Sequence, residues 1–241
     1  MSASPPAPPP IGETIRLVVR DALVVILTFV VMFMGVGRAS AEAGLNALQT
    51  AFMTLFTVAA PAQAAAMQIL DSDTAGATAW VAAVVAVIIV NLRFMVMAAS
   101  ILGRLPNPGV AKGIGAIGLI SASSFAILLP RLMGEAPRRP ILYCGLVGLA
   151  CSLSAVFGAV LGHQIATAVP VLVGTALGAM IPIYFATLIA RQGRHRILML
   201  NALAGAVLVP LAAPLLGSFS LIVVPLVVSG LTLLIPSSKE A

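Results

Sequence analysis

Long stretches without a single charge constrain this chain more than any other feature. No Asp, Glu, Lys or Arg lies between Arg139 and Arg191, or between Arg196 and Lys239. A membrane-spanning helix needs about 20 consecutive, predominantly apolar residues, and each of these runs is long enough for two. Charged residues make up only 8% of the 241 residues, whereas soluble domains carry about 25%. We therefore expect an all-α polytopic membrane protein.

Turn signals divide the chain into about eight apolar segments, which are marked off by proline, glycine and small polar residues. The segments cover approximately residues 17–36, 47–70, 76–101, 110–131, 140–162, 167–190, 196–214 and 218–236. They are predicted to form one transmembrane helical domain over residues 13–236. A proline-rich tail, residues 1–12, is expected to be disordered, and residues 237–241 form a short cytoplasmic tail.

The distribution of lysine and arginine predicts that both termini are cytoplasmic, because short cytoplasmic loops carry an excess of these residues. With eight crossings, Arg38, Arg104 and Lys112 fall outside and the other basic residues at helix ends fall inside. Two features oppose this topology: Arg104 and Lys112 lie outside, and the acidic loop that begins at Asp71 lies inside. A re-entrant second or fourth segment would remove both conflicts. Six to eight crossings are therefore compatible with the sequence. The basic residues sit at helix ends rather than in an aromatic-rich patch, so we expect no nucleic acid partner.

Arg93 interrupts the third segment at about half the depth of a membrane. On one continuous helix it lies ~15 Å from Arg104 along the axis, which is half of a ~30 Å hydrocarbon core. An arginine at that depth costs roughly 2.5 to 3.5 kcal/mol on insertion scales, so it should face protein, water or an anionic ligand. Asn91 lies about 200° from Arg93 around a regular helix, and both can face one site only if the helix unwinds.

Gln63 is a candidate for solute binding because it follows Pro61, which predicts an interruption of the second segment. The backbone groups and small residues of a broken helix can bind the charged ends of an amino acid. Pro182 predicts a corresponding break in the sixth segment, which hints at an internal repeat.

Ser121, Ser124 and Asp21 complete the set of candidate polar residues. The two serines share a helix face and can offer hydroxyl groups to a ligand, although serine in membrane helices more often bonds to its own backbone or joins helices. Asp21 has two equally supported interpretations. It is either an interfacial carboxylate paired with a neighbouring arginine or the partner of Arg93.

Two Gly-x-x-x-Gly spacings, 158–162 and 174–178, predict places where helix backbones approach closely. Packing within one chain is favoured over a dedicated dimer face. Catalytic and metal-binding patterns are missing, including Gly-x-Ser-Gly and His-Glu-x-x-His. The two methionine pairs, Met32 with Met34 and Met95 with Met97, point to opposite sides of a helix and cannot chelate one soft ion, so core packing explains them better. We expect no enzyme activity, no metal and no cofactor.

Three stretches resemble the AzlC-like family of branched-chain amino acid exporters, the large subunits of two-component bacterial efflux systems. Arg20-Asp21-Ala22-Leu23 is similar to the family's Arg-Asp-Ala-Leu-Pro motif. Residues 58–65, Val-Ala-Ala-Pro-Ala-Gln-Ala-Ala, stand where the family has a Phe-Ala-Gly-Ala-Ser-Gln-Phe-Ala type segment. Asn91-Leu92-Arg93 is similar to its Asn-Leu-Arg-His motif. The order and spacing agree over roughly the first 130 residues.

The chain also departs from this pattern. Phe94 replaces the motif's histidine, and residues 121–125, Ser-Ala-Ser-Ser-Phe, stand where the family usually has Thr-Asp-Glu-Thr-Phe. Two acidic groups are thereby lost. If the family couples transport to protons through those carboxylates, this chain must use Asp21, no titrating group, or a different mechanism.

The resemblance implies export of small amino acids, of the branched-chain type, across the bacterial inner membrane by alternating access. Arg93 would bind or gate the substrate carboxylate, Asn91 and Gln63 would add hydrogen bonds from two broken helices, and Ser121 and Ser124 would line the route. The resemblance also implies a small partner subunit of about four membrane helices, and a homo-oligomer is left open. Two alternatives are a transporter of a different small organic solute and a non-transporting or regulatory assembly subunit, in which Arg93 pairs with Asp21.

Overall fold

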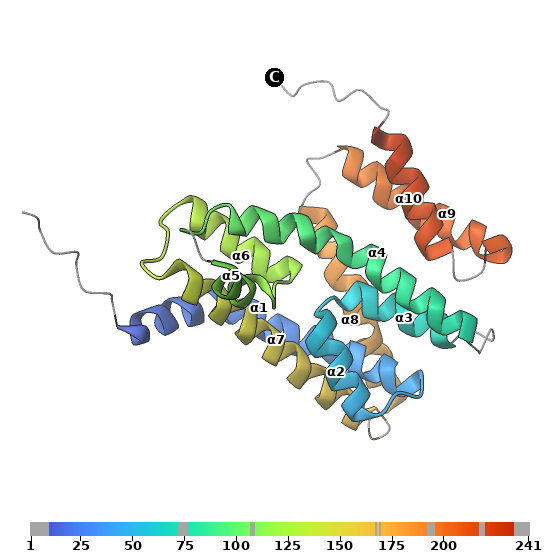
Figure 1. Cartoon of the computed structure of the whole chain (residues 1–241). Helices are drawn as coiled ribbons and strands as arrows, with labels where there is room; N and C mark the ends of the chain where they lie inside the picture. The colour runs from blue at the N-terminus through green and yellow to red at the C-terminus, as the bar shows by residue number, and fades with distance from the viewer. Residues whose placement is uncertain are drawn as a thin grey trace, which may run out of the picture.

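Helices form every regular element in the part of the chain that the computed structural model describes, which is residues 10–71, 77–106, 109–166, 168, 170–191, 196–216 and 220–233 (Figure 1). The ten helices are α1 (Ile11–Glu42), α2 (Ala47–Thr57), α3 (Ala60–Asp71), α4 (Ala77–Leu102), α5 (Gly109–Ile117), α6 (Ala122–Met133), α7 (Pro140–Ile165), α8 (Val171–Arg191), α9 (Arg196–Leu216) and α10 (Ser220–Leu233). The all-α class is confirmed, and each predicted segment is helical. The second segment is divided into α2 and α3, and the fourth into α5 and α6.

The predicted number of about eight membrane crossings is not confirmed. Four helices in the described ranges are long and apolar enough to cross a membrane, namely Ile11–Glu42, Ala83–Leu102, Pro140–Ile165 and Met199–Leu216. Helix α1 already begins at Ile11, inside the predicted tail of residues 1–12. The first nine residues of that tail and the predicted tail of residues 237–241 lie outside the described residues.

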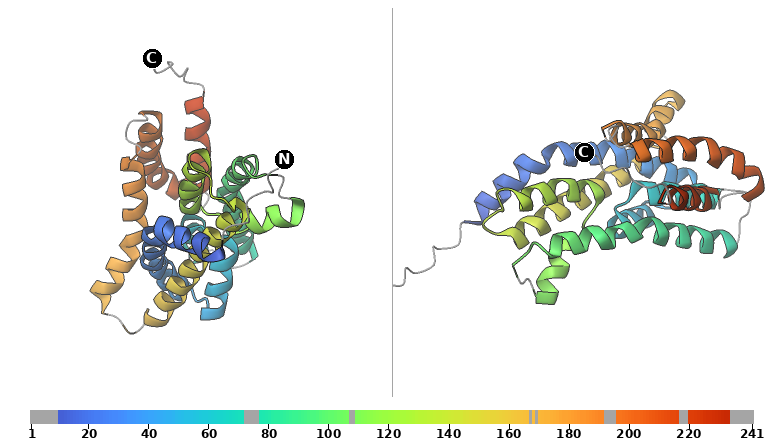
Figure 2. Two further views of the ribbon diagram at one scale, coloured as in Figure 1. Left: turned by 90° about the vertical axis from the view of Figure 1, so that its left-hand side faces the viewer. Right: turned by 90° about the horizontal axis from the view of Figure 1, so that it is seen from above.

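The centre of the molecule is the pair of long helices α1 and α7, which lie side by side along much of their length (Figures 1 and 2). Gly158 and Gly162 of α7 lie directly on the backbone of α1, where added Cβ atoms would overlap Val30 and Met34. Gly37 of α1 is equally close to the α7 backbone. The first glycine spacing therefore packs helices within the chain, as predicted.

The second glycine spacing serves a different purpose. Gly174 of α8 lies against the guanidinium group of Arg38 on α1, so a larger residue would displace that side chain. A Cβ atom added to Gly178 would meet nothing within 4 Å. Only the first glycine of this pair therefore lies at a contact between described helices.

Two interrupted helices flank the α1–α7 pair. Helix α2 packs on α7, α3 packs on α4 and α1, and both α5 and α6 pack on α7. Helices α9 and α10 pack chiefly against each other, at one end of the molecule in Figure 1. The largest core cluster of buried side chains runs through α1, the two interruptions and α7.

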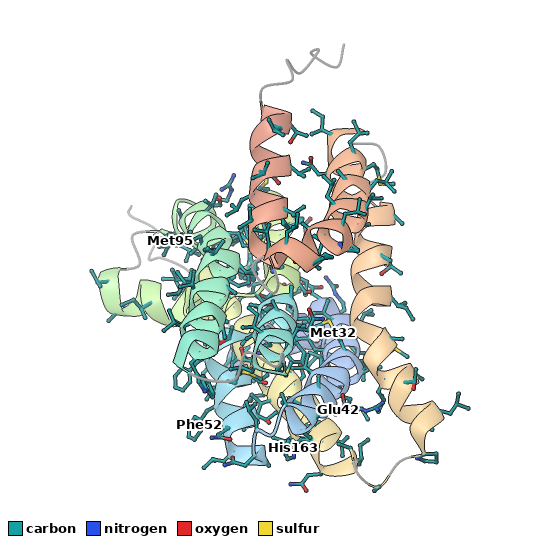
Figure 3. The ribbon with its side chains drawn as sticks, turned by 90° about the vertical axis from the view of Figure 1, so that its right-hand side faces the viewer. Met32, Glu42, Phe52, Met95 and His163 are labelled. Atoms are coloured by element: carbon teal, nitrogen blue, oxygen red, sulfur yellow. The ribbon has the colours of Figure 1, made fainter. Side chains whose placement is uncertain are left out.

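Methionine packing differs between the two pairs in the sequence. Met32 on α1 is buried in the core, which agrees with a packing role. Met95 on α4 is 69% exposed and lies on the outer surface, as does Phe52 on α2 (Figure 3). Core packing is therefore the wrong explanation for Met95, because α4 turns this face away from the rest of the chain.

Candidate functional site

The interruption between α2 and α3 places Gln63 in the core. Pro61 is the second residue of α3, where its missing N–H removes no helical hydrogen bond, and the break lies just before it at Val58 and Ala59. Gln63 is fully buried in the first turn of α3. The predicted break of the second segment is confirmed. The buried carboxamide of Gln63, which has both donor and acceptor atoms, lies within one helical turn of this break.

The side chain of Gln63 bridges the two halves of this broken helix. Its Nε2 atom donates to the carbonyl oxygen of Met53 at 3.4 Å, and Thr54 Oγ1 donates to its Oε1 at 3.5 Å. Both distances are at the long end of the hydrogen-bond range, so these bonds are weak. The amide is held in the break by contacts that a better-placed polar ligand can replace.

An apolar cavity of about 720 Å³ adjoins this bridge at Met53, although Gln63 itself does not line it. It is partly open and lies between the loop after α1, α2, α3 and α4. Its lining includes Gln49, Phe52, Met53, Ala66, Leu70, Trp80, Val84 and Ile88. Met53 belongs both to the cavity wall and to the partners of Gln63. Volumes of 300 to 1,000 Å³ with a few polar groups are typical of small-molecule sites.

The interruption between α5 and α6 contains Ser121 and Ser124, and their hydroxyl groups are occupied. Ser121 Oγ accepts a hydrogen bond from the Ser124 backbone N–H at 3.1 Å, and Ser124 Oγ accepts one from the Ser121 N–H at 2.7 Å. This reciprocal arrangement is a capping box at the start of α6. Both residues are buried. In this conformation the pair fixes the end of a helix, the backbone role that the sequence favoured.

Helix α4 is continuous through Asn91 and Arg93, so of the two alternatives for this motif the local break is not found. The two side chains consequently lie on different sides of the helix. Asn91 is partly buried, and its Oδ1 atom has no hydrogen-bond partner in the described structure. Arg93 is exposed, and its guanidinium lies over the neighbouring ring of Phe94 at 5.1 Å. No ion pair joins Arg93 to any other described residue.

Asp21 is paired with residues other than Arg93. Its Oδ1 atom lies 3.1 Å from Arg20 Nε, and its Oδ2 atom lies 3.5 Å from Arg131 Nε. Tyr143 donates its hydroxyl proton to Oδ2 at 3.0 Å. These contacts join α1, α6 and α7. The prediction of a neighbouring arginine is met by Arg20, while Arg131 and Tyr143 were not identified in the sequence.

The sequence contained a faint signal for these two residues. Arg131 is the basic residue in the last turn of α6, and Tyr143 is one of two tyrosines in the chain. Neither fact assigns a partner, because Tyr143 is 122 positions from Asp21. Only the packing of α1, α6 and α7 brings the three groups together.

The six predicted site residues therefore do not form one cluster in this conformation. They lie on α1, α3, α4 and α6 or just before α6, and within the described structure only Ser121 and Ser124 hydrogen-bond to one another. Pro182 does not interrupt α8, so the predicted break in the sixth segment is wrong. The second interrupted segment is the fourth one, whose signals are Gly118 and the Ser121 cap.

Two other polar residues in the apolar region, His163 and Asn201, each use one side-chain atom to join two parts of the chain. His163 in the last turn of α7 lies 2.8 Å from the carbonyl oxygen of Leu45, near the end of the molecule where Figure 3 labels Glu42 and His163. Asn201 donates to Thr232 at 3.1 Å and joins α9 to α10. No group of three or more His, Cys, Asp or Glu residues that could hold a metal ion occurs within the described ranges.

Comparison with known proteins assigns the family. The family model described as AzlC protein matches residues 24–181, which include both interrupted helices, α4, α7 and α1 from residue 24 onward. No curated protein and no solved structure matches the chain.

Proposed function

The chain belongs to the AzlC family, and from this premise we propose that it exports small amino acids, of the branched-chain type, across the bacterial inner membrane by alternating access. The family and the apolar helices indicate a component of a membrane transporter. Amino acid specificity, outward direction and the inner membrane are parts of the proposal.

One observation carries the proposal, namely the buried Gln63 at a helix break beside an apolar cavity. A branched-chain amino acid has two charged groups next to a short apolar side chain. The cavity wall of α2, α3 and α4 suits the apolar part. The carboxamide of Gln63 and the backbone groups freed at residues 57–60 suit the charged part, because such groups replace the water that a charged group loses.

The arrangement of helices also suits alternating access. Close glycine contacts make the α1–α7 pair a rigid unit, whereas the α2–α3 and α5–α6 segments each contain a short non-helical link. Such links are places where backbone angles can change while packed helices keep their shape. We assign the movement to these two segments and the fixed frame to α1 and α7.

The test is counterflow of labelled leucine in vesicles that contain the purified protein. We expect Gln63→Leu to lower the rate by about tenfold or more, because a hydrogen bond to a charged group is worth about 1.5 to 3 kcal/mol. Gln68→Leu is the matched control, since Gln68 lies on the exposed side of the same helix. Equal rates for wild type and Gln63→Leu would exclude the assignment of this site.

A second function is favoured by one observation, the exposed charge of Arg93 on an apolar helix. We infer that α4 binds another membrane subunit through this face. An unpaired guanidinium at membrane depth is costly, and a carboxylate on a neighbouring helix would neutralise it. The non-transporting assembly role remains the alternative to export, and both are compatible with a partner at α4.

A further inference from the structure

A polar cavity of about 340 Å³ lies at the N-terminal end of α1, away from the proposed transport site. Its walls come from the first turns of α1, the end of α6 and the loop that leads into α7. Four arginines line it, Arg16, Arg20, Arg131 and Arg138, together with Glu13 and Glu135. The lining therefore carries an excess of positive charge.

Asp21 forms ion pairs with two of these arginines. Arg20 Nε donates a hydrogen bond to Asp21 Oδ1 at 3.1 Å, whereas Arg131 Nε lies 3.5 Å from Oδ2 without a hydrogen bond. A guanidinium has five N–H donors, and the four on its Nη atoms are not used by this contact. Neither Arg20 nor Arg131 has a hydrogen-bond partner for its Nη atoms within the described residues. Two guanidinium groups beside one carboxylate thus keep free Nη donors, and guanidinium groups bind phosphate through such donors in bidentate, charge-assisted hydrogen bonds.

An apolar stripe on α1 continues from this cavity. Leu23, Leu27 and Val31 follow Arg16 and Arg20 within about a quarter of the helix circumference. These three apolar side chains are 47%, 59% and 45% exposed. From Arg20 to Val31 the helix rises ~16 Å, close to half of a ~30 Å hydrocarbon core.

The deep end of the stripe opens into a second, apolar cavity of about 430 Å³ between α1 and α8. Leu27 and Val31 line it from α1, and Met180 and Ile183 line it from α8. A cluster of arginines, an exposed apolar stripe and an apolar cavity therefore follow one another along α1. Their order matches that of a phosphate head group and an acyl chain.

We propose that this groove binds an anionic phospholipid, with the phosphate held by Arg16, Arg20 and Arg131 and one acyl chain lying along α1 into the α1–α8 cavity. Basic pockets at the cytoplasmic ends of membrane helices bind anionic lipids in this way. Glu13 and Glu135 reject a second negative charge and accept hydrogen bonds from hydroxyl groups, so a singly charged, glycerol-bearing head group suits the cavity.

The test measures lipid retention by native mass spectrometry of the full-length protein, with dioleoyl phosphatidylglycerol and dioleoyl phosphatidylcholine as probes. We expect preferential retention of phosphatidylglycerol, and a loss of about fivefold per arginine in Arg16→Gln with Arg20→Gln. Arg104→Gln is the control, because Arg104 is exposed at the end of α4 and its guanidinium bonds its own helix at Ser100. Equal retention of the two lipids, or equal loss in the control, would overturn the proposal.

A second variant separates the acyl chain from the head group. Leu27→Trp fills the α1–α8 cavity and is expected to weaken binding of the dioleoyl lipid while leaving dihexanoyl phosphatidylglycerol unaffected. Competition by free glycerol phosphate or by leucine at millimolar concentration would show that the cavity serves a soluble anion or the transported solute. Either result would contradict the lipid assignment.

Discussion

The carboxylate of Asp21 shows how strongly one residue can depend on distant parts of the chain. It accepts a hydrogen bond from Tyr143 on α7 and forms ion pairs with Arg20 on α1 and Arg131 at the end of α6. Tyr143 is fully buried, whereas the side chain of Asp21 keeps 17% of its surface exposed. The contact therefore has a protected side and a solvated side, as expected at a membrane boundary.

Tyr143→Phe is expected to lower the stability of the protein without changing its packing. The substitution removes one hydrogen bond to a charged acceptor, which is worth about 1.5 to 3 kcal/mol. Thermal denaturation in detergent, followed by size-exclusion chromatography, measures the shift. In an Asp21→Asn background the same substitution should cost less, because residues in contact couple in a double-mutant cycle. Additive effects would show that the bond contributes nothing.

At the scale of elements, the two proline signals had different outcomes for a physical reason. Pro61 stands in the first turn of α3, where its missing N–H leaves no bond to be made, and the chain enters a new helix there. Pro182 lies in the middle of α8, which stays helical. Membrane helices tolerate such prolines because neighbouring groups satisfy the freed carbonyl.

The break before α6 depends on a cap rather than on proline. Ser121 and Ser124 satisfy backbone groups at the start of α6, so a helix can begin inside an apolar segment without unpaired donors. Serine is a preferred N-cap residue, and Ser121 stands three positions after Gly118, although Ser124 takes the place of the Glu or Gln of the usual capping box. This pattern lies inside a long apolar run over residues 110–131. The run predicted one continuous segment, so no break was predicted at the cap.

Glycine substitutions test how closely α1 and α7 must pack. We expect Gly162→Ala to lower the thermal midpoint, because the new Cβ overlaps the backbone of Met34 and such overpacking costs about 1 to 3 kcal/mol. Gly178→Ala should leave the midpoint unchanged or raise it, since its Cβ meets nothing within 4 Å and alanine favours helix by about 1 kcal/mol. A higher midpoint for Gly162→Ala would show that the helices are not in close contact.

At the scale of the whole molecule, the outward face of α4 stands out. Leu92, Met95 and Val96 are all more than half exposed on this helix. Apolar exposure alone suits lipid, but Arg93 lies at the edge of the same face without an ion pair to a described residue. The charge is the reason that we assign a protein partner to this face.

A photo-crosslinking amino acid at Val96, three residues after Arg93, tests this interface in native membranes. We expect a crosslinked product with a second membrane protein, and at least a fivefold loss of that product in Arg93→Leu. Leaving the partner's carboxylate unpaired would cost roughly 3 to 5 kcal/mol. The same crosslinker at Val24 of α1, which is 75% exposed, is the control. If the amount of crosslinked product were unchanged in Arg93→Leu, the charge of Arg93 would not contribute to this interface.

Local patterns predicted much of the secondary structure. Charge-free intervals located every helical segment to within about six residues at each end, because an apolar run must form helices to satisfy its backbone in lipid. Pro61 located the first break. Of the candidate site, the position of Gln63 beside that break followed from sequence, whereas its bridge to Met53 and Thr54 depends on how α3 folds back onto α2.

The amino-acid sequence by itself determined the class, the order of the helices and the residues that carry the AzlC resemblance, since all of these depend on neighbours within one or two turns. The tertiary structure decided which residues meet. It paired Asp21 with Arg131 and Tyr143, left Arg93 on an outer face, and set the arginine cavity above the apolar stripe of α1. The physical reason is that these contacts join residues far apart in the sequence, and they form only where small residues let the helix backbones approach.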